Sequence, residues 1–388
     1  MFTLLYTNCC TDIREKAGTH MSKGILLFTD FHANLWSESS KPTEEYVNDR
    51  LKFQIDTLNK MLKDAQGKNL DVLFAGDMFH KRGAVDVRVY NAVFQTFTSY
   101  PDIEHIYLIR GNHDSYNNSL ETDSSLDMFN VLPSVQVITK PTVLAEEGRP
   151  TFYFMPYGED TDYMLSLMHK WSKQAQASKT LSIFSGHVGI NGAKQGATMH
   201  RLASTFGAED INCKAYDLVY LGHYHYRQEI YNDEQGYVYG NADNDVPNHA
   251  QYKNEAFYGG STIPVSFSDE GQIKGYDIYY YKTKERVFVP VEAPRFITLH
   301  EWNKDLAEKY KNDYIRLQLP EKQAKEASIA TKDTSSVRVE VKADYKADLR
   351  LPIEASDSPY KITSEYTSKM YPKLKEKALE CIKEVSDD

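Results

Sequence analysis

Short apolar runs that each end in a polar cluster are the feature that most constrains the fold of this chain. Five occur: GILLF before TDFH, DVLFA before GDMFH, IYLI before RGNHD, LSIFS before GHVG, and DLVYL before GHYH. Continuous apolar runs of this length are typical of strands buried on both faces of a sheet. Open α/β folds place their ligand-binding loops at the C-terminal ends of such strands. The five clusters are therefore predicted to meet at one edge.

The stretches between these runs predict helices, and so an α/β class. Residues 43–67 carry apolar side chains on one helical face, with Thr43 as the expected N-cap and Gly67 as the end. Residues 85–100 and 163–177 are also amphipathic, and residues 271–291 predict a β-hairpin.

A domain boundary is expected near Pro294. Residues 295–320 then predict a small β-α-β unit, whereas residues 321–336 are polar and linker-like. Residues 362–382 repeat apolar side chains at helical spacing, and Pro372 begins or kinks that helix. The predicted domains are a main α/β domain at 22–293, a smaller α+β domain at 294–350 and a helical C-terminal region at 351–388. Residues 1–21 are a leader, either a disordered arm or the product of an alternative start.

Composition excludes several classes of protein. No apolar run in the 388 residues is long enough to span a bilayer, so a cytosolic protein without a membrane partner is expected. The four cysteines match neither a disulfide framework nor a zinc-knuckle spacing. A formal net charge of -10 argues against tight nucleic-acid binding through bulk electrostatics, although metal ions and a partner can supply the positive charge.

The polar clusters together form a candidate metal-binding set. Its members are Asp30, His32, Asp77, Asn112, His113, His187, His223 and His225. Any one of them alone is more often structural, and His223 and His225 alone read as surface histidines in a turn. Imidazoles combined with carboxylates and an amide suit two ions of Mn²⁺, Fe or Zn²⁺ better than Mg²⁺ alone. The joint pattern therefore favours a site for two divalent ions.

In this order, the motifs resemble the calcineurin-like metallophosphoesterases. They are DFH at 30–32, GD at 76–77, GNHD at 111–114, GH at 186–187 and GHYH at 222–225. The resemblance covers roughly residues 22–270. It implies a four-layer αββα sandwich, followed here by a smaller α+β capping region and a terminal helix.

Within that superfamily the chain most resembles the SbcD and Mre-eleven DNA-repair nucleases. The second motif continues as GDMFHKRGAV, which puts His80 three residues after Asp77. The stretch FYGGSTIPVSFSDEGQIKGYDIYYY resembles that family's Gly-Ser, Pro, Ser-Phe and Gly-X-X-Lys-Gly-Tyr ending. The regions after residue 293 match its capping and partner-binding regions more loosely, in order and size.

The resemblance assigns a role to each candidate. It implies that Asp30, His32, Asp77 and His225 hold one ion and that Asp77, Asn112, His187 and His223 hold the other, with Asp77 bridging. It further implies that His113 protonates the leaving 3′ oxygen, that Asp114 orients His113, and that His80 lies beside the scissile phosphate. The alternative for His80 and Asp114 is a purely structural role. His200 and Arg201 are loop residues within possible reach of substrate.

The function implied is a Mn²⁺-dependent DNA exonuclease and endonuclease. It would work in DNA repair and recombination with an SMC-type ATPase of the SbcC or Rad-fifty type, docked through the C-terminal helix, in a bacterial or phage-infected cell. Homodimers would form through residues 85–100 and 120–132. Two alternatives remain: a stand-alone phosphatase or small-molecule phosphodiesterase, and a non-enzymatic scaffold. The C-terminal helix has an alternative too, which is packing on its own domain.

Overall fold

The computed structural model describes residues 22–194, 206–233, 236–241, 256–332, 334–342 and 358–386. The predicted leader and the pair His200 and Arg201 lie outside these ranges. The chain divides into two units, Met1–Glu340 and Val341–Asp388. The finer boundaries at 293/294 and 350/351 stay predictions.

The first unit contains a six-stranded sheet in the order β13-β12-β1-β2-β3-β4. Its strands are β1 (Gly24–Phe28), β2 (Leu70–Phe74), β3 (Ile106–Ile109), β4 (Val135–Ile138), β12 (Gly275–Tyr280) and β13 (Glu285–Pro290). Strands β1 to β4 run parallel, whereas β12 pairs antiparallel with β1 and with β13. The predicted hairpin at 271–291 is thus confirmed and completes the edge of this sheet.

A second sheet has seven strands in the order β10-β9-β11-β8-β7-β6-β5. They are β5 (Thr142–Leu144), β6 (Thr151–Met155), β7 (Ser182–His187), β8 (Leu218–Gly222), β9 (Gln228–Asp233), β10 (Gly236–Asn241) and β11 (Ala256–Tyr258). The central strands β6, β7, β8 and β11 are parallel. All five apolar runs of the sequence are therefore parallel strands, three in the first sheet and two in the second.

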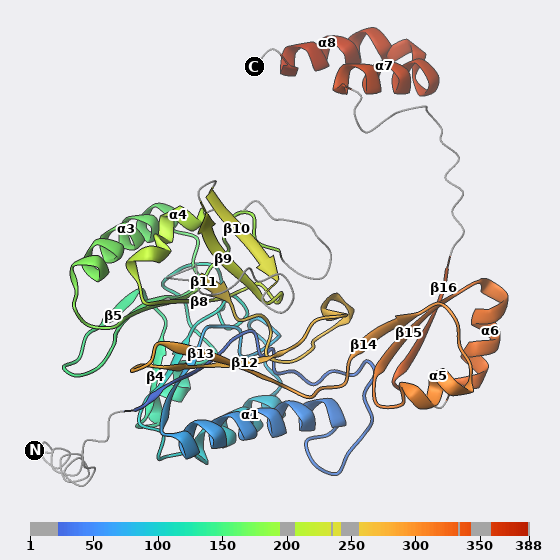
Figure 1. The fold of residues 1–388 in the computed structure, drawn as a ribbon. Coiled ribbons are helices and arrows are strands. Elements are labelled where there is room, and N and C mark those ends of the chain that lie inside the picture. Colours follow the sequence, from blue (N-terminus) through green and yellow to red (C-terminus); the bar gives the residue numbers. More distant parts are fainter. Residues whose placement is uncertain are drawn as a thin grey trace, which may run out of the picture. The chain divides into compact units, whose positions relative to one another are not determined.

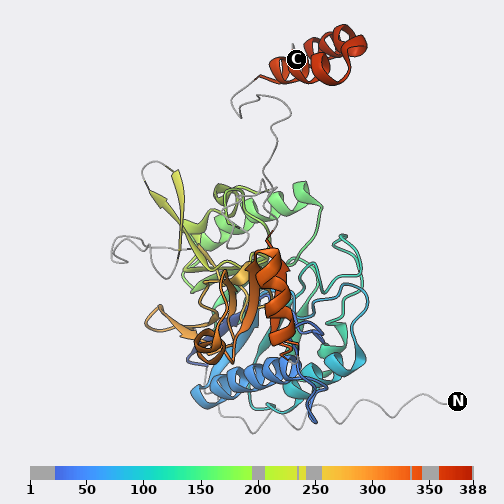
Figure 2. The same ribbon diagram turned by 90° about the vertical axis from the view of Figure 1, so that its right-hand side faces the viewer.

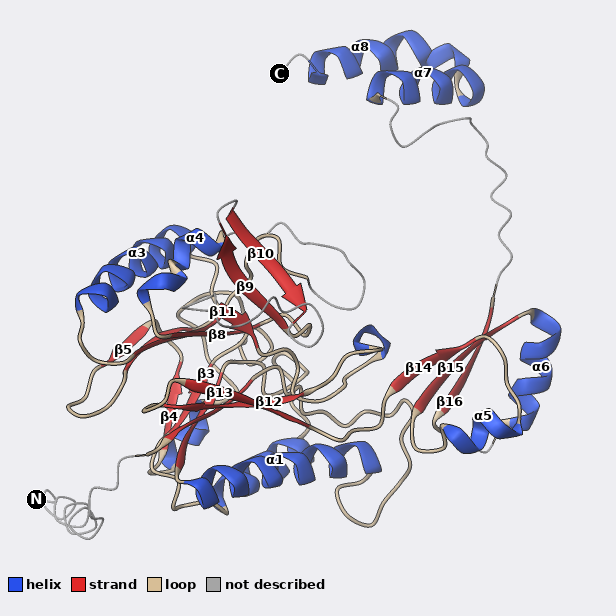
Figure 3. Cartoon of the chain, in the orientation of Figure 1, coloured by secondary structure: helices blue, strands red, loops and turns tan. Residues whose placement is uncertain are grey.

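The two sheets stack face to face with helices on both outer faces, as Figure 3 shows. Ile25 and Leu27 belong to the core between the sheets, whereas Leu26 and Phe28 belong to the core beneath the helices. This alternation follows from the two-residue period of a strand. Helices α1 (Asp49–Lys68) and α2 (Val87–Thr98) and the short helix η1 (Asp127–Val131) cover the first sheet, and α3 (Thr161–Ala177) and α4 (Ala208–Ile211) cover the second. The predicted four-layer αββα sandwich is confirmed.

Helix α1 begins later than the sequence predicts. Asn48, not Thr43, is the N-cap, because its side-chain oxygen accepts the N–H of Leu51 at 2.9 Å. Tyr46 and Val47 have positive φ angles of 55° and 71°, which exclude them from a helix. At the other end the helix runs past Gly67 to a left-handed cap at Asn69.

A three-stranded sheet, β14-β15-β16, follows the sandwich (Figure 1 and Figure 2). Its elements are β14 (Phe296–Leu299), α5 (Lys304–Lys309), β15 (Tyr314–Leu319), α6 (Glu321–Ala330) and β16 (Val337–Val341). Strands β14 and β15 are parallel, which confirms the β-α-β unit. The linker predicted at 321–336 is wrong, because α6 packs Ala324 and Ala327 against Leu317 and Leu319. Small alanines gave this helix too weak an apolar pattern to detect.

The second unit consists of two helices, α7 (Pro359–Met370) and α8 (Lys375–Ser386), joined through a short turn at Pro372–Leu374. The apolar pattern at 362–382 is therefore divided between two helices, with the break at Pro372, where the sequence predicted a kink or a helix start. Within the described residues, no helix is both long enough and apolar enough to cross a membrane.

Candidate metal centre

Polar side chains from both sheets meet at the C-terminal ends of the parallel strands, as predicted. Asp30 and His32 follow β1, Asp77 follows β2, Asn112 follows β3, His187 ends β7, and His223 and His225 follow β8. Potential ligand atoms of Asp30, His32 and His225 lie within 4.8 Å of one another, as do those of Asp30, Asp77 and His187. The two groups share Asp30 and are therefore adjacent.

The first group places two imidazoles against a carboxylate. The Nε2 atoms of His32 and His225 are 2.8 Å apart, and they lie 4.0 and 3.8 Å from Oδ1 of Asp30. Oδ2 of Asp77 lies 3.8 Å from Nε2 of His32. Asp30 and His32 are buried, whereas the side chain of His225 is 27% exposed, so the group opens to solvent on one side.

The second group surrounds the side-chain oxygen of Asn112. Nε2 of His187 lies 2.9 Å and Nδ1 of His223 lies 3.0 Å from that oxygen. His187 donates its Nδ1–H to the carbonyl of Ala75 at 2.8 Å, so Nε2 is the nitrogen that faces the site. Oδ2 of Asp77 lies 3.4 Å from the same Nε2. Asp77 thus lies between the two groups, where a bridging carboxylate is expected.

Several of these residues have strained backbones. Asp30, His32, Asp77 and His223 have φ angles of 49°, 48°, 65° and 100°, in the left-handed region that non-glycine residues rarely adopt. Such strain costs roughly 1–3 kcal/mol per residue and collects at functional sites. Gly111 permits the close packing, because a Cβ atom there would collide with the carboxylate of Asp77. At these positions the residue types serve the geometry of the site at a cost in stability.

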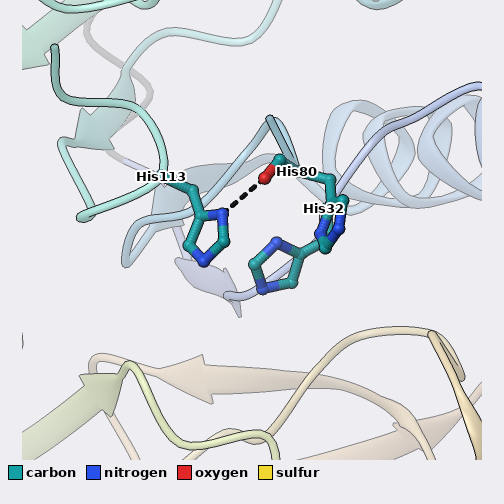
Figure 4. Close-up of side chains that lie close together, drawn as sticks. All are labelled: His32, His80 and His113. Atoms are coloured by element: carbon teal, nitrogen blue, oxygen red, sulfur yellow. Dashed lines mark hydrogen bonds between the residues drawn. The ribbon is translucent and has the colours of Figure 1, made fainter. Parts of the chain in front are cut away.

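His113 and His80 form a third part of the site. The ligand atoms of His32, His80 and His113 lie within 4.8 Å of one another, and Figure 4 shows the three rings together. His113 donates its Nδ1–H to the backbone carbonyl of His80, and its own backbone N–H donates to Oδ1 of Asp77 at 2.7 Å. The Nε2 atom of His113 is thereby left for a reacting group.

Asp114 does not orient His113, contrary to what the resemblance implied. Its carboxylate accepts the backbone N–H groups of Asp77, Met78, Phe79 and Gly111 at 2.8–3.2 Å. The carbonyl of His80 takes the Nδ1–H of His113 instead. Asp114 therefore holds together the two loops that follow β2 and β3, which is the structural alternative for this residue.

Burial and neighbouring charges shift the pKa values of these groups. Burial raises the pKa of Asp30 and lowers those of His223 and His80, to about 3 and about 4. Burial also opposes a charge on His187, but the Asp77 carboxylate outweighs it and raises the pKa of His187 to about 9. The Asp77 carboxylate thus favours positive charge at this position.

The donor set fits a pair of divalent ions. Oδ1 of Asp30 is buried and has no hydrogen-bond partner among the described residues. An acceptor left in this way is costly unless a cation or water satisfies it. The orphaned oxygen faces two ring nitrogens, and the second group likewise turns acceptor atoms toward one another. Imidazole, carboxylate and amide donors in this number suit divalent transition ions.

Sequence reasoning missed three residues beside the site. The Trp36 ring lies 4.4 Å from that of His80, and the Tyr157 ring lies 6.0 Å from that of His223. Tyr157 lines a cavity of about 190 Å³ next to His187 and His223. Lys274 donates to the backbone carbonyl of His225 at 2.8 Å and pairs with Asp269. Trp36 and Tyr157 belong to none of the quoted motifs, whereas Lys274 is the lysine of the Gly-X-X-Lys-Gly-Tyr ending, for which no contact with the site was predicted.

A two-sheet sandwich with aspartate, histidine and asparagine gathered at its strand ends defines a metal-dependent phosphoester hydrolase. Residues 24–227 match the model of the calcineurin-like phosphoesterase family, and the chain belongs to this family. No curated protein matches the chain.

Two solved structures are similar in part. A dimetal phosphatase from Danio rerio shares 9% identity over 69% of this chain and 95% of its own, with a TM-score of 0.43. GAP50, the anchor in the inner membrane complex of Plasmodium, shares 12% identity over 69% of this chain and 88% of its own, with a TM-score of 0.37. Neither likeness is close enough to indicate a substrate.

Proposed function

We propose that the chain is a Mn²⁺-dependent DNA exonuclease and endonuclease of the SbcD and Mre-eleven type, acting in the cytoplasm on DNA ends. The observation that carries the proposal is the position of His80. It adds an imidazole beside His113 and His32, on a side of the site where His80 and His113 are themselves partly exposed. A large substrate can approach from that side, and a second imidazole can position its phosphate.

Each part of the site has a task in this proposal. Two Mn²⁺ ions, held by Asp30, His32, Asp77 and His225 and by Asp77, Asn112, His187 and His223, would polarise the phosphate and activate a water. His113 keeps its Nδ1–H bond to the carbonyl of His80 and gives an Nε2 proton to the leaving 3′ oxygen. His80 places the phosphate. Asp114 keeps the two loops in register.

A comparison of substrates tests this proposal. The purified chain with Mn²⁺ should shorten an end-labelled DNA duplex and hydrolyse bis-p-nitrophenyl phosphate, while p-nitrophenyl phosphate stays intact. A His113→Gln variant should lose at least 10²-fold in the rate of both diester reactions. Hydrolysis of the monoester with untouched DNA would assign the chain to the phosphatases instead. Silence with every substrate, with and without an ATPase partner, would favour the scaffold.

The C-terminal unit is proposed to bind the coiled coil of an SMC-type ATPase. Helices α7 and α8 and their connection expose Tyr360, Tyr366, Met370, Tyr371 and Leu374, each at 41–55%. An exposed apolar surface of this kind is typical of helix-in-groove recognition. A chain ending at residue 342 should keep diester hydrolysis and lose binding to the ATPase. Equal binding by both chains would place the contact elsewhere.

A homodimer is proposed through α2 and η1. The two elements pack through Phe129 against Phe94 and Phe97, while Val87, Met128 and Val131 are 61–67% exposed. A Met128→Glu, Val131→Glu double variant should shift the mass measured by light scattering from dimer to monomer. A wild-type monomer at micromolar concentration would contradict the proposal.

A further inference from the structure

The imidazole of His80 is held by ring packing. Its centroid lies 4.4 Å from the Trp36 ring at 46° and 5.5 Å from the His113 ring at 22°. Its Nδ1 atom is buried and has no hydrogen-bond partner in the described part of the chain. Because no bond to Nδ1 fixes the rotation of the ring, the neighbouring rings set its position.

Trp36 is stacked in turn against Arg50. The guanidinium carbon of Arg50 lies 4.9 Å from the centre of the Trp36 ring. Arg50 is only 6% exposed, and it donates to the backbone carbonyls of Glu38 at 3.1 Å and Val265 at 2.9 Å. These two bonds fix the plane of the guanidinium, which makes Arg50 a rigid support for the indole.

Arg50 also contacts the capping region, residues 294–340. Its guanidinium carbon lies 5.5 Å from the centre of the Phe296 ring and 5.0 Å from that of Tyr314, at the first residues of β14 and β15. Contacts between a cation and aromatic rings are strongest where the cation is removed from water, as Arg50 is here. Arg50 is thus joined both to the capping sheet and to the residue that packs on His80.

We propose that Arg50 and Trp36 are positioning residues. They couple the position of the His80 imidazole to the position of the capping region on the sandwich. Movement of β14 and β15, for example by a bound partner, displaces Arg50, and Trp36 transmits the displacement to His80. The effect on catalysis rests on the function proposed above for His80. A displacement of about 1 Å at a group that places the substrate is enough to change a rate by up to 10²-fold.

A second arginine at the same interface provides a matched control. Arg316 lies 4.5 Å from the centre of the Phe267 ring and 3.7 Å from Glu270, and it donates to Thr298 at 2.8 Å. It joins the capping sheet to the sandwich as Arg50 does. No ring contact or hydrogen bond connects it to Trp36 or His80 among the described residues. General loosening of the interface should therefore follow from either substitution, whereas Arg50→Lys also removes the contact with Trp36 and should displace His80 much further.

The test compares Arg50→Lys with Arg316→Lys in the full-length chain. Lysine keeps the charge and loses the planar stacking surface. The metal-free protein, labelled with ¹³C in histidine, should show a clear shift of the His80 ring signal in Arg50→Lys and a much smaller one in Arg316→Lys. His80→Gln identifies the signal. Because no hydrogen bond or ring contact joins Arg50 to His80, such a shift reports transmission through Trp36.

Kinetics supply the second readout. With Mn²⁺ and a diester substrate, Arg50→Lys should lower kcat about tenfold at unchanged KM and unchanged Mn²⁺ affinity, while Arg316→Lys should change kcat much less. Trp36→Leu should resemble Arg50→Lys, and Trp36→Phe, which retains a ring, should recover most of the rate. In a His80→Gln background, Arg50→Lys should have no further effect, because the two act through one group.

Three outcomes overturn the proposal: an unmoved His80 signal in Arg50→Lys, equal shifts in both lysine variants, or effects of Arg50→Lys and His80→Gln that multiply. If Arg50→Lys does not fold, Tyr314→Leu applies the same test from the capping side. If His80→Gln keeps the full rate, the catalytic role proposed for His80 fails, while the ring signal still decides whether Arg50 and Trp36 position it.

Discussion

Two buried carboxylates lie at opposite ends of the neighbouring strands β1 and β2. They differ in the hydrogen bonds that their oxygen atoms accept. At the N-terminal end of β2, Asp71 accepts from Ser22 at 2.7 Å, from Arg149 at 2.7 Å and from Tyr281 at 2.8 Å. After the C-terminal end of β1, Asp30 keeps one oxygen without a hydrogen-bond partner in the described chain. Both residues are 0% exposed. Burial alone therefore does not distinguish a structural carboxylate from a functional one.

Asp71 and Asp30 differ in their hydrogen-bond and charged partners. Burial raises the pKa of both carboxyl groups; the Arg149 guanidinium opposes that effect at Asp71, and the imidazoles of His187 and His225 oppose it at Asp30. A cavity of about 920 Å³ next to Asp71 is much larger than the cavity of about 190 Å³ beside His187. Size favours the first cavity as a site of chemistry. The interactions of the buried groups favour the second cavity. Of the two cavities, it is the one where buried polar atoms, left-handed backbones and convergent imidazoles occur together.

The largest expected effect comes from Asp30→Asn. The substitution removes a carboxylate from the donor set, and diester hydrolysis should fall on the order of 10³-fold. The free energy of unfolding of the metal-free protein should stay the same or rise, because a buried charge with one oxygen lacking a hydrogen bond is lost. Assays of rate and urea unfolding on the same preparation check both parts. A large loss of stability would show that Asp30 is structural, as Asp71 is.

Arg149→Met is the counterpart at the other end. It leaves Asp71 buried without its charged partner, and the free energy of unfolding should fall by about 3 kcal/mol. The side chain of Arg149 is only 12% exposed, so solvent screens the pair little. Activity per folded molecule should not change. Urea unfolding followed by circular dichroism gives the first quantity, and a loss of kcat would break the separation between the two ends.

The sequence predicted the polar residues after the C-terminal ends of the strands. It predicted almost none of the interactions at the N-terminal end of β2. Asp30, His32, Asp77 and the strand-end histidines were predictable because each directly follows a continuous apolar run. The four-layer arrangement was predictable from the same runs with the family resemblance. Asp71 lies inside its run, and its partners come from distant segments.

Helix boundaries and side-chain partners were the parts that failed. The start of α1 depended on which side chain bonded a backbone N–H, and Asn48 does so instead of the predicted Thr43. The role of Asp114 depended on four N–H groups that only the folded loops bring together. The packing of Trp36 on His80 joins two loops of different strands, so no local pattern signals it.

Addition of Mn²⁺ should give the Asp30 carboxylate a partner and so reduce its difference from Asp71. At a concentration of 100 times Kd, binding to the folded state should stabilise the protein by about 2.7 kcal/mol. Because the folded pKa of Asp30 lies above 3.8, its carboxyl group must lose a proton to bind the ion. The stabilisation should therefore grow as pH rises above 3.8 and shrink as pH falls. Thermal melts with Mn²⁺ and with EDTA at several pH values measure it. Arg149→Met should keep the increment and Asp30→Asn should lose it.

Tyr281→Phe has the smallest expected effect and sharpens the comparison most. It removes only the hydroxyl that donates to Oδ2 of Asp71 at 2.8 Å and leaves the ring in place. Loss of one hydrogen bond to a charged group should lower the free energy of unfolding by about 1.5 kcal/mol. Tyr280→Phe is the matched control, since Tyr280 lines the same cavity and its hydroxyl makes no hydrogen bond among the described residues. If both variants unfold at the same urea concentration as wild type, the hydrogen bond from Tyr281 to Asp71 does not stabilise the fold. Hydrogen-bond partners then cannot be the property that separates Asp71 from Asp30.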